Sequence, residues 1–183
     1  MSESTKERVI DQLCGYISQL RALPPPEHGL VASLTGGPIW EPAMICEPRL
    51  GPFSTNDEFH DCLRHDIPLS IFDKNPSWTW APSVVHAHSL KYETKATHGD
   101  LAGRNILCKA DGTITCILDW ETSGWYPEYW EYTKARYFPS NGPDWIKRIG
   151  LITGEYPDQF WASVNVREHI TVDPPEHYIY KEK

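Results

Sequence analysis

The sequence predicts an α+β fold that is mainly α-helical, and we expect a single domain over residues 1–183. Apolar residues recur at helical spacing near the N-terminus and again in the last third of the chain. Between these regions, Asp111-Gly112 separates two β-branched, apolar runs, which is the strongest short-range signal for a tight β-hairpin. With 40% hydrophobic residues, a chain of 183 residues can build the core of one domain.

The first helix is expected to run from Ser4 to about Leu23. Ser4 and Glu7 have the S-x-x-E spacing of a capping box, and the prolines at 24–26 would end the helix. The apolar positions that follow the cap at helical spacing are Val9, Leu13, Ile17 and Leu20. This pattern predicts one long N-terminal helix.

The segment after this helix is rich in glycine and proline up to about Asp57, so we expect loops there. Asp57 can cap a short helix that continues through Leu63. Residues 66–90 are expected to be irregular, because prolines stand at positions 68, 76 and 82.

The last third of the chain predicts three helices, because prolines 127, 143 and 157 can each occupy the first position of a helix. An aromatic run around the first of them is interpreted as core packing rather than as a platform for sugars: Trp125, Tyr126, Tyr129, Trp130 and Tyr132. The tail, residues 171–183, is expected to fray.

Composition excludes several classes of function. The net charge is −8 and no basic stripe is present, which argues against a surface for nucleic acid or anionic membranes. The polar N-terminus is no secretory signal, and no segment approaches the roughly 20 apolar residues of a membrane helix. Five cysteines without C-x-x-C spacing indicate neither a disulfide framework nor a zinc site. We therefore expect a cytoplasmic protein that binds neither nucleic acid nor membrane.

The predicted hairpin brings polar residues together at its open end. A two-residue turn at 111–112 places Asn105 opposite Leu118, so that Asn105 and Asp119 lie side by side. Asp100 stands five residues before Asn105 and enters the hairpin from the same end. Three oxygen-bearing side chains at one point suit a hard divalent cation such as Mg²⁺.

The spacing His98-x-Asp100-x-x-x-x-Asn105 is that of the catalytic loop of phosphotransferases. In that loop the aspartate accepts or orients the proton of the substrate hydroxyl, and the asparagine binds a metal ion. Asp119 stands after the hairpin, where a second metal-binding aspartate is expected. The spacing therefore predicts a site for phosphoryl transfer.

The segments HGDLAGRNIL and ILDWETSGWYPEYWEY resemble the aminoglycoside phosphotransferase-like family, distant relatives of protein kinases. The resemblance extends over about residues 5–170 and is sharp over 97–132. It implies a protein-kinase-like C-terminal lobe with a catalytic-loop β-hairpin. In place of the proline that many relatives carry in this loop, the chain has Ala102-Gly103-Arg104.

The resemblance also implies roles for individual residues. Asp100 would be the catalytic base, and Asn105 and Asp119 would bind Mg²⁺ and, through it, the nucleotide cofactor. His98 would support the catalytic loop. Glu121 would make a supporting contact to the metal or to water.

The activity implied by the resemblance is a kinase reaction, in which the γ-phosphoryl group of ATP (or GTP) passes to a small-molecule hydroxyl. The N-terminal β-lobe of the family is not expected here, because the chain begins at what resembles the first helix of the C-terminal lobe. The alternative function is therefore a truncated or pseudokinase lobe that acts as a non-catalytic binding module. In either case we expect an exposed apolar patch where the lobe would dock, and a protein partner could cover that surface.

Two other readings of the polar residues remain as alternatives. His86 and His88 would share one face of a strand and, with His98 and Asp100, could form a metal-hydrolase cluster. Asp119 and Glu121 could form the carboxylate pair of a glycosidase.

Overall fold

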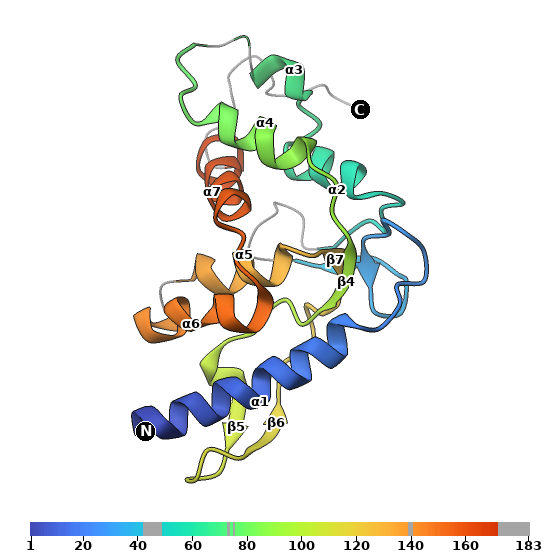
Figure 1. Cartoon of the computed structure of the whole chain (residues 1–183). Helices are drawn as coiled ribbons and strands as arrows, with labels where there is room; N and C mark the ends of the chain where they lie inside the picture. Colours follow the sequence, from blue (N-terminus) through green and yellow to red (C-terminus); the bar gives the residue numbers. More distant parts are fainter. Residues whose placement is uncertain (42–48, 73, 75, 139–140, 172–183) are drawn as a thin grey trace.

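The structure is a computed structural model that describes residues 1–41, 49–72, 74, 76–138 and 141–171 (Figure 1). Helices and strands are mixed, as predicted. The helices are α1 (Glu3–Arg21), α2 (Asn56–Leu63), α3 (Leu69–Phe72), α4 (Ala81–Ser89), α5 (Trp130–Tyr137), α6 (Pro143–Thr153) and α7 (Pro157–Val166), with a 3-10 turn η1 (Gly103–Asn105) and a π-helical turn η3 (Arg167–Thr171). The strands are β1 (Ala32–Ser33), β2 (Ile39–Trp40), β3 (Arg49–Leu50), β4 (Thr94–Thr97), β5 (Ile106–Cys108), β6 (Ile114–Ile117) and β7 (Gly124–Pro127).

Helix α1 confirms the predicted long N-terminal helix but begins earlier than expected. Its N-cap is Ser2, whose hydroxyl accepts a hydrogen bond from the backbone N–H of Thr5 at 3.2 Å. The capping box proposed for Ser4 and Glu7 is therefore wrong. The apolar face is as predicted, and its buried members are Val9, Ile10, Leu13 and Ile17.

The middle of the chain is more helical than the sequence suggested. Thr55, rather than Asp57, caps α2 and accepts a hydrogen bond from the N–H of Glu58 at 3.1 Å. Residues 66–90 contain two helices, α3 and α4, so the expectation of an irregular segment is wrong. Pro82 stands in the first turn of α4, where a helix needs no backbone N–H donor.

The three proline-based predictions for the last third of the chain have different outcomes. Helices α6 and α7 begin at Pro143 and Pro157, as predicted. Pro127 instead ends strand β7, and α5 begins three residues later at Trp130. Of the tail expected to fray, only Thr171 is described, as the last residue of η3.

Helix α5 lies between two clusters of the hydrophobic core. One cluster contains Phe59, Tyr126 and Trp130 and reaches α4 and α7. The other contains Leu13 and Ile149 and joins α1, α6 and the β5–β6 hairpin. All five aromatic residues of the run at 125–132 are buried, which confirms that they are core. Because α5 is buried from Trp130 to Ala135, the charged side chains of Glu131 and Lys134 also lie in the interior.

A small three-stranded sheet in the order β1-β7-β4 fixes the end of the molecule that carries the candidate site. Ser33 and Thr97, the last residues of β1 and β4, both pair with Gly124, the first residue of β7. A side chain at 124 would place a Cβ atom 2.4 Å from the carbonyl oxygen of Ala32, so only glycine fits there. The segment that follows Ser33 and the segment that follows Thr97 therefore start on either side of Gly124.

The β5–β6 hairpin confirms the predicted register at its open end and corrects it at its turn. Ile106 pairs with Ile117, and the N–H of Leu118 donates to the carbonyl of Asn105 at 2.8 Å. A bulge between residues 107 and 108 then shifts the pairing by one residue. The turn at 110–112 has three residues rather than two, with Gly112 in the left-handed region at φ 84°.

In the part of the chain that the structure describes, no helix is both long and apolar enough to cross a membrane.

Candidate active site

The candidate catalytic loop begins where β4 ends. After Thr97 the chain turns sharply at Gly99, whose φ is 84°. A Cβ atom at this position would lie 2.5 Å from the backbone oxygen of Thr122. The loop can therefore pass this close to the segment before β7 only because residue 99 is glycine.

Asp100 and Asn105 are in direct contact. The side-chain nitrogen of Asn105 donates to the backbone oxygen and to Oδ2 of Asp100, both at 2.9 Å. Arg104 approaches from the other side, with Nη2 at 2.6 Å from both carboxylate oxygens of Asp100. The guanidinium also donates to Asn141 at 2.7 Å. These contacts fix the Asp100 carboxylate and leave Oδ1 of Asn105 unused by Asp100.

Asp119 follows the open end of the hairpin. The bond between Leu118 and Asn105 places it one residue beyond the partner of Asn105. Its φ is 67°, which is uncommon for a residue other than glycine, and such strain is concentrated at functional sites. Its side chain is exposed, so the carboxylate oxygens face solvent.

His98 lies fully buried between the loop and the hairpin. Its Nε2 donates to the carbonyl of Leu118 at 2.9 Å, which makes Nδ1 the acceptor for the N–H of Asp100 at 3.2 Å. Its ring centroid is 4.6 Å from that of Trp120. The imidazole thus joins the segment that carries Asp100 to the segment that carries Asp119.

Glu121 lies apart from this group. Its side chain is exposed on the turn into β7, where it lines a cavity with residues of β1, β2 and β3. Among the described residues, no hydrogen bond or ion pair joins it to His98, Asp100, Asn105 or Asp119. The structure therefore brings together four of the five residues singled out from the sequence.

Glu131 was not identified from the sequence. It is 1% exposed in α5, and its carboxylate accepts the backbone N–H of His98 at 2.6 Å and that of Gly99 at 3.1 Å. Burial raises the pKa of this carboxyl, whereas His98 and the two backbone donors oppose the rise. A glutamate inside a helix of aromatic core residues was the available signal, because a buried carboxylate requires partners.

The metal-hydrolase cluster is not formed. His86 and His88 lie on helix α4 rather than on a strand, so residues two apart point in different directions. His88 is buried against Arg64, and His98 is used by the loop. No three His, Cys, Asp or Glu side chains within the described ranges are grouped so that they could hold a metal ion.

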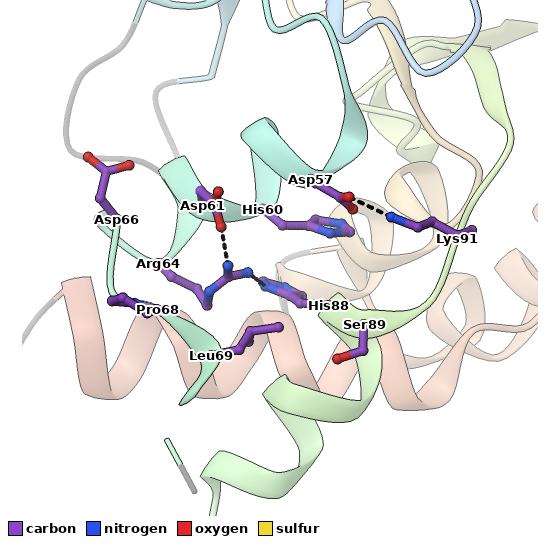
Figure 2. Close-up of a pocket in the computed structure, with 10 residues that line it drawn as sticks. All are labelled: Asp57, His60, Asp61, Arg64, Asp66, Pro68, Leu69, His88, Ser89 and Lys91. Carbon is purple, nitrogen blue, oxygen red and sulfur yellow. Dashed lines mark hydrogen bonds and ion pairs between the residues drawn. The ribbon is translucent and has the colours of Figure 1, made fainter. Parts of the chain in front are cut away.

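His88 instead belongs to a second cavity of about 480 Å³ between α2 and α4 (Figure 2). The buried Arg64 lies between Asp61, with which it forms an ion pair, and Nδ1 of His88, 2.6 Å from Nη1. The ring of His60 stacks on that of His88 at 4.3 Å and hydrogen-bonds to Tyr129 at 2.9 Å. Burial, and then the Arg64 charge, lower the pKa of His60 to about 4.

The chain matches one family model, that of the phosphotransferase enzyme family, over residues 1–159. No curated protein sequence matches it. Among solved structures, it is similar to the apo form of a thermostable mutant of aminoglycoside phosphotransferase APH(4)-Ia, with a TM-score of 0.48 and 17% sequence identity. That match covers 91% of this chain and 65% of the other, so the chain spans less than two thirds of the length of that structure.

Replacing Glu131 by glutamine tests the contact between α5 and the loop. Glutamine has one acceptor oxygen and would turn an NH₂ group toward the second backbone donor, so one buried N–H loses its partner. We expect a loss of about 1–3 kcal/mol in the free energy of unfolding, together with faster hydrogen exchange at His98 and Gly99. Glu7→Gln on the exposed face of α1 is the matched control. Unchanged exchange at both amides would show that Glu131 does not hold the loop.

Stability should fall in acid because of His60. With a folded pKa of about 4 and an unfolded pKa of about 6.5, the unfolded chain takes up the proton first. The free energy of unfolding should therefore fall between about pH 6.5 and pH 4, by up to about 1.4 kcal/mol per pH unit for this group.

Urea unfolding across this pH range measures the effect. His60→Gln cannot titrate and can still bond Tyr129, so its profile should be flatter than that of the wild type. His86→Gln, at an exposed position of α4, should leave the profile unchanged. Equal slopes for the wild type and His60→Gln would contradict the assignment.

Proposed function

The chain belongs to the phosphotransferase enzyme family, and we propose that it transfers the γ-phosphoryl group of ATP to a hydroxyl group of a small molecule. The observation that carries this proposal is the meeting of Asp100, Asn105 and the Leu118–Asp119 segment at the open end of one hairpin. Phosphoryl transfer depends almost entirely on positioning and on electrostatic stabilisation of the transferring group. A fixed loop beside an exposed carboxylate meets the first of these requirements.

Asp100 acts as the catalytic base in this proposal. The acceptor oxygen forms a bond to the γ-phosphorus, and its proton passes to the Asp100 carboxylate. The bond from the γ-phosphorus to the bridging oxygen breaks, and its electron pair leaves with ADP. Arg104 bonds both carboxylate oxygens in this structure, but its side chain is 51% exposed, so an entering acceptor can displace it toward solvent.

Asn105 and Asp119 would hold Mg²⁺. Their chemistry fits the ion, since a carboxylate facing solvent and an amide oxygen not used by Asp100 are hard oxygen donors. When bound, Mg²⁺ neutralises charge on the phosphate oxygens. His98 supports the geometry, because its two ring nitrogens set the separation between Asp100 and Leu118.

The exposed face of the hairpin would receive the nucleotide. Ile106 and Ile117 pack against the core, so the adjoining positions on the opposite face point outward. Leu107 is 46% and Leu118 41% exposed, and both are close in sequence to the proposed metal ligands. By the same family resemblance we assign the chain to a kinase-like C-terminal lobe, in which such an apolar face lies against the nucleotide base or against a covering protein segment.

Calorimetric titration with Mg²⁺–ATP tests the proposal. We expect saturable binding by the wild type and by Asp11→Ala, which removes an exposed carboxylate from α1. Asp119→Ala should bind at least about tenfold more weakly, because one good charged contact is worth more than about 1.4 kcal/mol. A parallel titration with Mg²⁺–GTP identifies the preferred nucleotide. Equal binding by all three proteins, or none by the wild type, would contradict the proposed nucleotide site.

Catalysis is measured separately through Asp100→Asn, which keeps the shape of the loop and removes the base. This variant should retain Mg²⁺–ATP binding but release phosphate from ATP, with water as the acceptor, about 10²–10⁴-fold more slowly. If turnover is undiminished, Asp100 is not the base. If the wild type binds the nucleotide without any turnover, the protein is a binding module.

A further inference from the structure

The turn between β1 and β2 lines a cavity of about 480 Å³. Glu121 lines the same cavity. Its lining includes Ser33, Thr35, Trp40 and Arg49. A cavity of this size is in the range of about 300–1,000 Å³ that is typical of small-molecule sites. Neither the predicted metal ligands nor the proposed nucleotide face is part of its lining.

The strand register places this cavity beside the catalytic loop. Ser33 and Thr97 both pair with Gly124, and neighbouring strands are about 5 Å apart, so their backbones are separated by about 10 Å. Thr97 leads directly into the catalytic loop, and Ser33 leads into the turn that lines the cavity. Glu121 stands two residues after Asp119. The cavity thus opens at the end of the sheet that carries the proposed chemistry.

Arg49 is the distinctive charge of the cavity. It is the cross-strand partner of Trp40, and its guanidinium carbon lies 5.3 Å from the centre of the indole ring. This cation–π contact restrains the side chain but leaves the N–H groups on the edge of the guanidinium available. In the part of the chain that the structure describes, no carboxylate forms an ion pair with Arg49.

The strand that carries Trp40 is itself anchored in the core. Glu41, the next residue, is fully buried and forms an ion pair with the buried Lys134 of α5. In the turn between β1 and β2, the hydroxyl of Ser33 accepts the N–H of Gly37 at 3.0 Å, and this bond fixes the turn. The backbone beside the indole ring and the turn that lines the cavity are therefore held in place before any ligand binds.

The two charged residues of the cavity, Arg49 and Glu121, would orient a bound molecule. Arg49 supplies donors for an anion, whereas Glu121 supplies an acceptor for a hydroxyl group and repels an anion. A molecule with an acidic group at one end and hydroxyl groups at the other would therefore bind with its acid on Arg49. Its hydroxyl groups would then face Glu121, which stands two residues after Asp119 in the chain.

We propose that this cavity binds the phosphoryl acceptor, and that the acceptor is a hydroxylated small molecule with an acidic group, either a carboxylate or a phosphate, held by Arg49. This inference rests on the proposed phosphotransferase function and specifies its substrate class. The bidentate edge of the guanidinium suits both kinds of acid.

The proposal is tested by measuring the binding of four six-carbon probes. Saturation-transfer NMR, without nucleotide, gives the affinity of each probe. Gluconate carries a carboxylate, glucose 6-phosphate a phosphate, sorbitol no charge, and glucosamine a positive charge. We expect at least one of the two anions to bind at least about tenfold more tightly than sorbitol and glucosamine, as one charged contact predicts. The anion that binds more tightly shows whether the acidic group of the acceptor is a carboxylate or a phosphate.

The preference must depend on Arg49. Arg49→Gln should remove it, and Arg49→Lys should keep only part of it, because lysine retains the charge but not the planar fork. Arg8→Gln, at an exposed position on α1, should bind as the wild type does, and circular dichroism confirms that each variant is folded. The proposal is overturned if neither anion binds saturably, if glucosamine binds more tightly, or if Arg49→Gln keeps the preference.

The nucleotide titration described above is independent of this measurement. If anions bind through Arg49 but Mg²⁺–ATP does not bind, the phosphotransferase proposal fails and the cavity is not an acceptor site. If Mg²⁺–ATP binds and no anion does, the phosphotransferase proposal stands and only the substrate class is wrong.

Discussion

The contact on which the candidate site depends is the one between a buried carboxylate and two backbone N–H groups. Glu131 lies in a helix between two clusters of the core and is itself 1% exposed, so its charge requires partners inside the protein. The partners are the amides of His98 and Gly99, at the point where the chain turns out of β4. The cost of burying the charge is thus offset by hydrogen bonds that hold the start of the candidate catalytic loop against a buried helix of the core.

The other contacts of the candidate site link His98 and Asn105 to Asp100 and Leu118. His98 is oriented by its backbone bond to Glu131, and its ring then reaches Asp100 on one side and Leu118 on the other. Asn105 repeats the same connection, through its side chain to Asp100 and through its carbonyl to Leu118. Segments that are separated in sequence are therefore joined twice, although no side-chain bond holds Asp119 within the described residues. That freedom suits the metal-binding role that we propose for this carboxylate.

Sequence reasoning was correct at the open end of the hairpin, and it missed features that depend on contacts between distant segments. It also misplaced helix starts, because Ser2 and Thr55 cap α1 and α2 in place of the predicted residues. The pairing of Asn105 with Leu118 follows from two apolar runs and a turn signal, and it is correct at the open end. The bulge was missed because it depends on α1, where Gln12 bonds Gly112 and Ile114. The role of Glu131 was also missed because it depends on a distant contact: its backbone partners lie about thirty residues away in the sequence. Prolines predicted α6 and α7 but misled at α4, where Pro82 is tolerated in the first turn.

The bulge between residues 107 and 108 divides the hairpin into two parts with different partners. The turn is attached to α1 through Gln12, whereas the open end is attached to the catalytic loop through Asn105. A bulge absorbs an extra residue locally, so a change in loop length at the turn need not alter the pairing at the open end. A change in the length of the hairpin tip would therefore alter the number of residues between Asp100 and Asp119 but not the place at which the two segments meet.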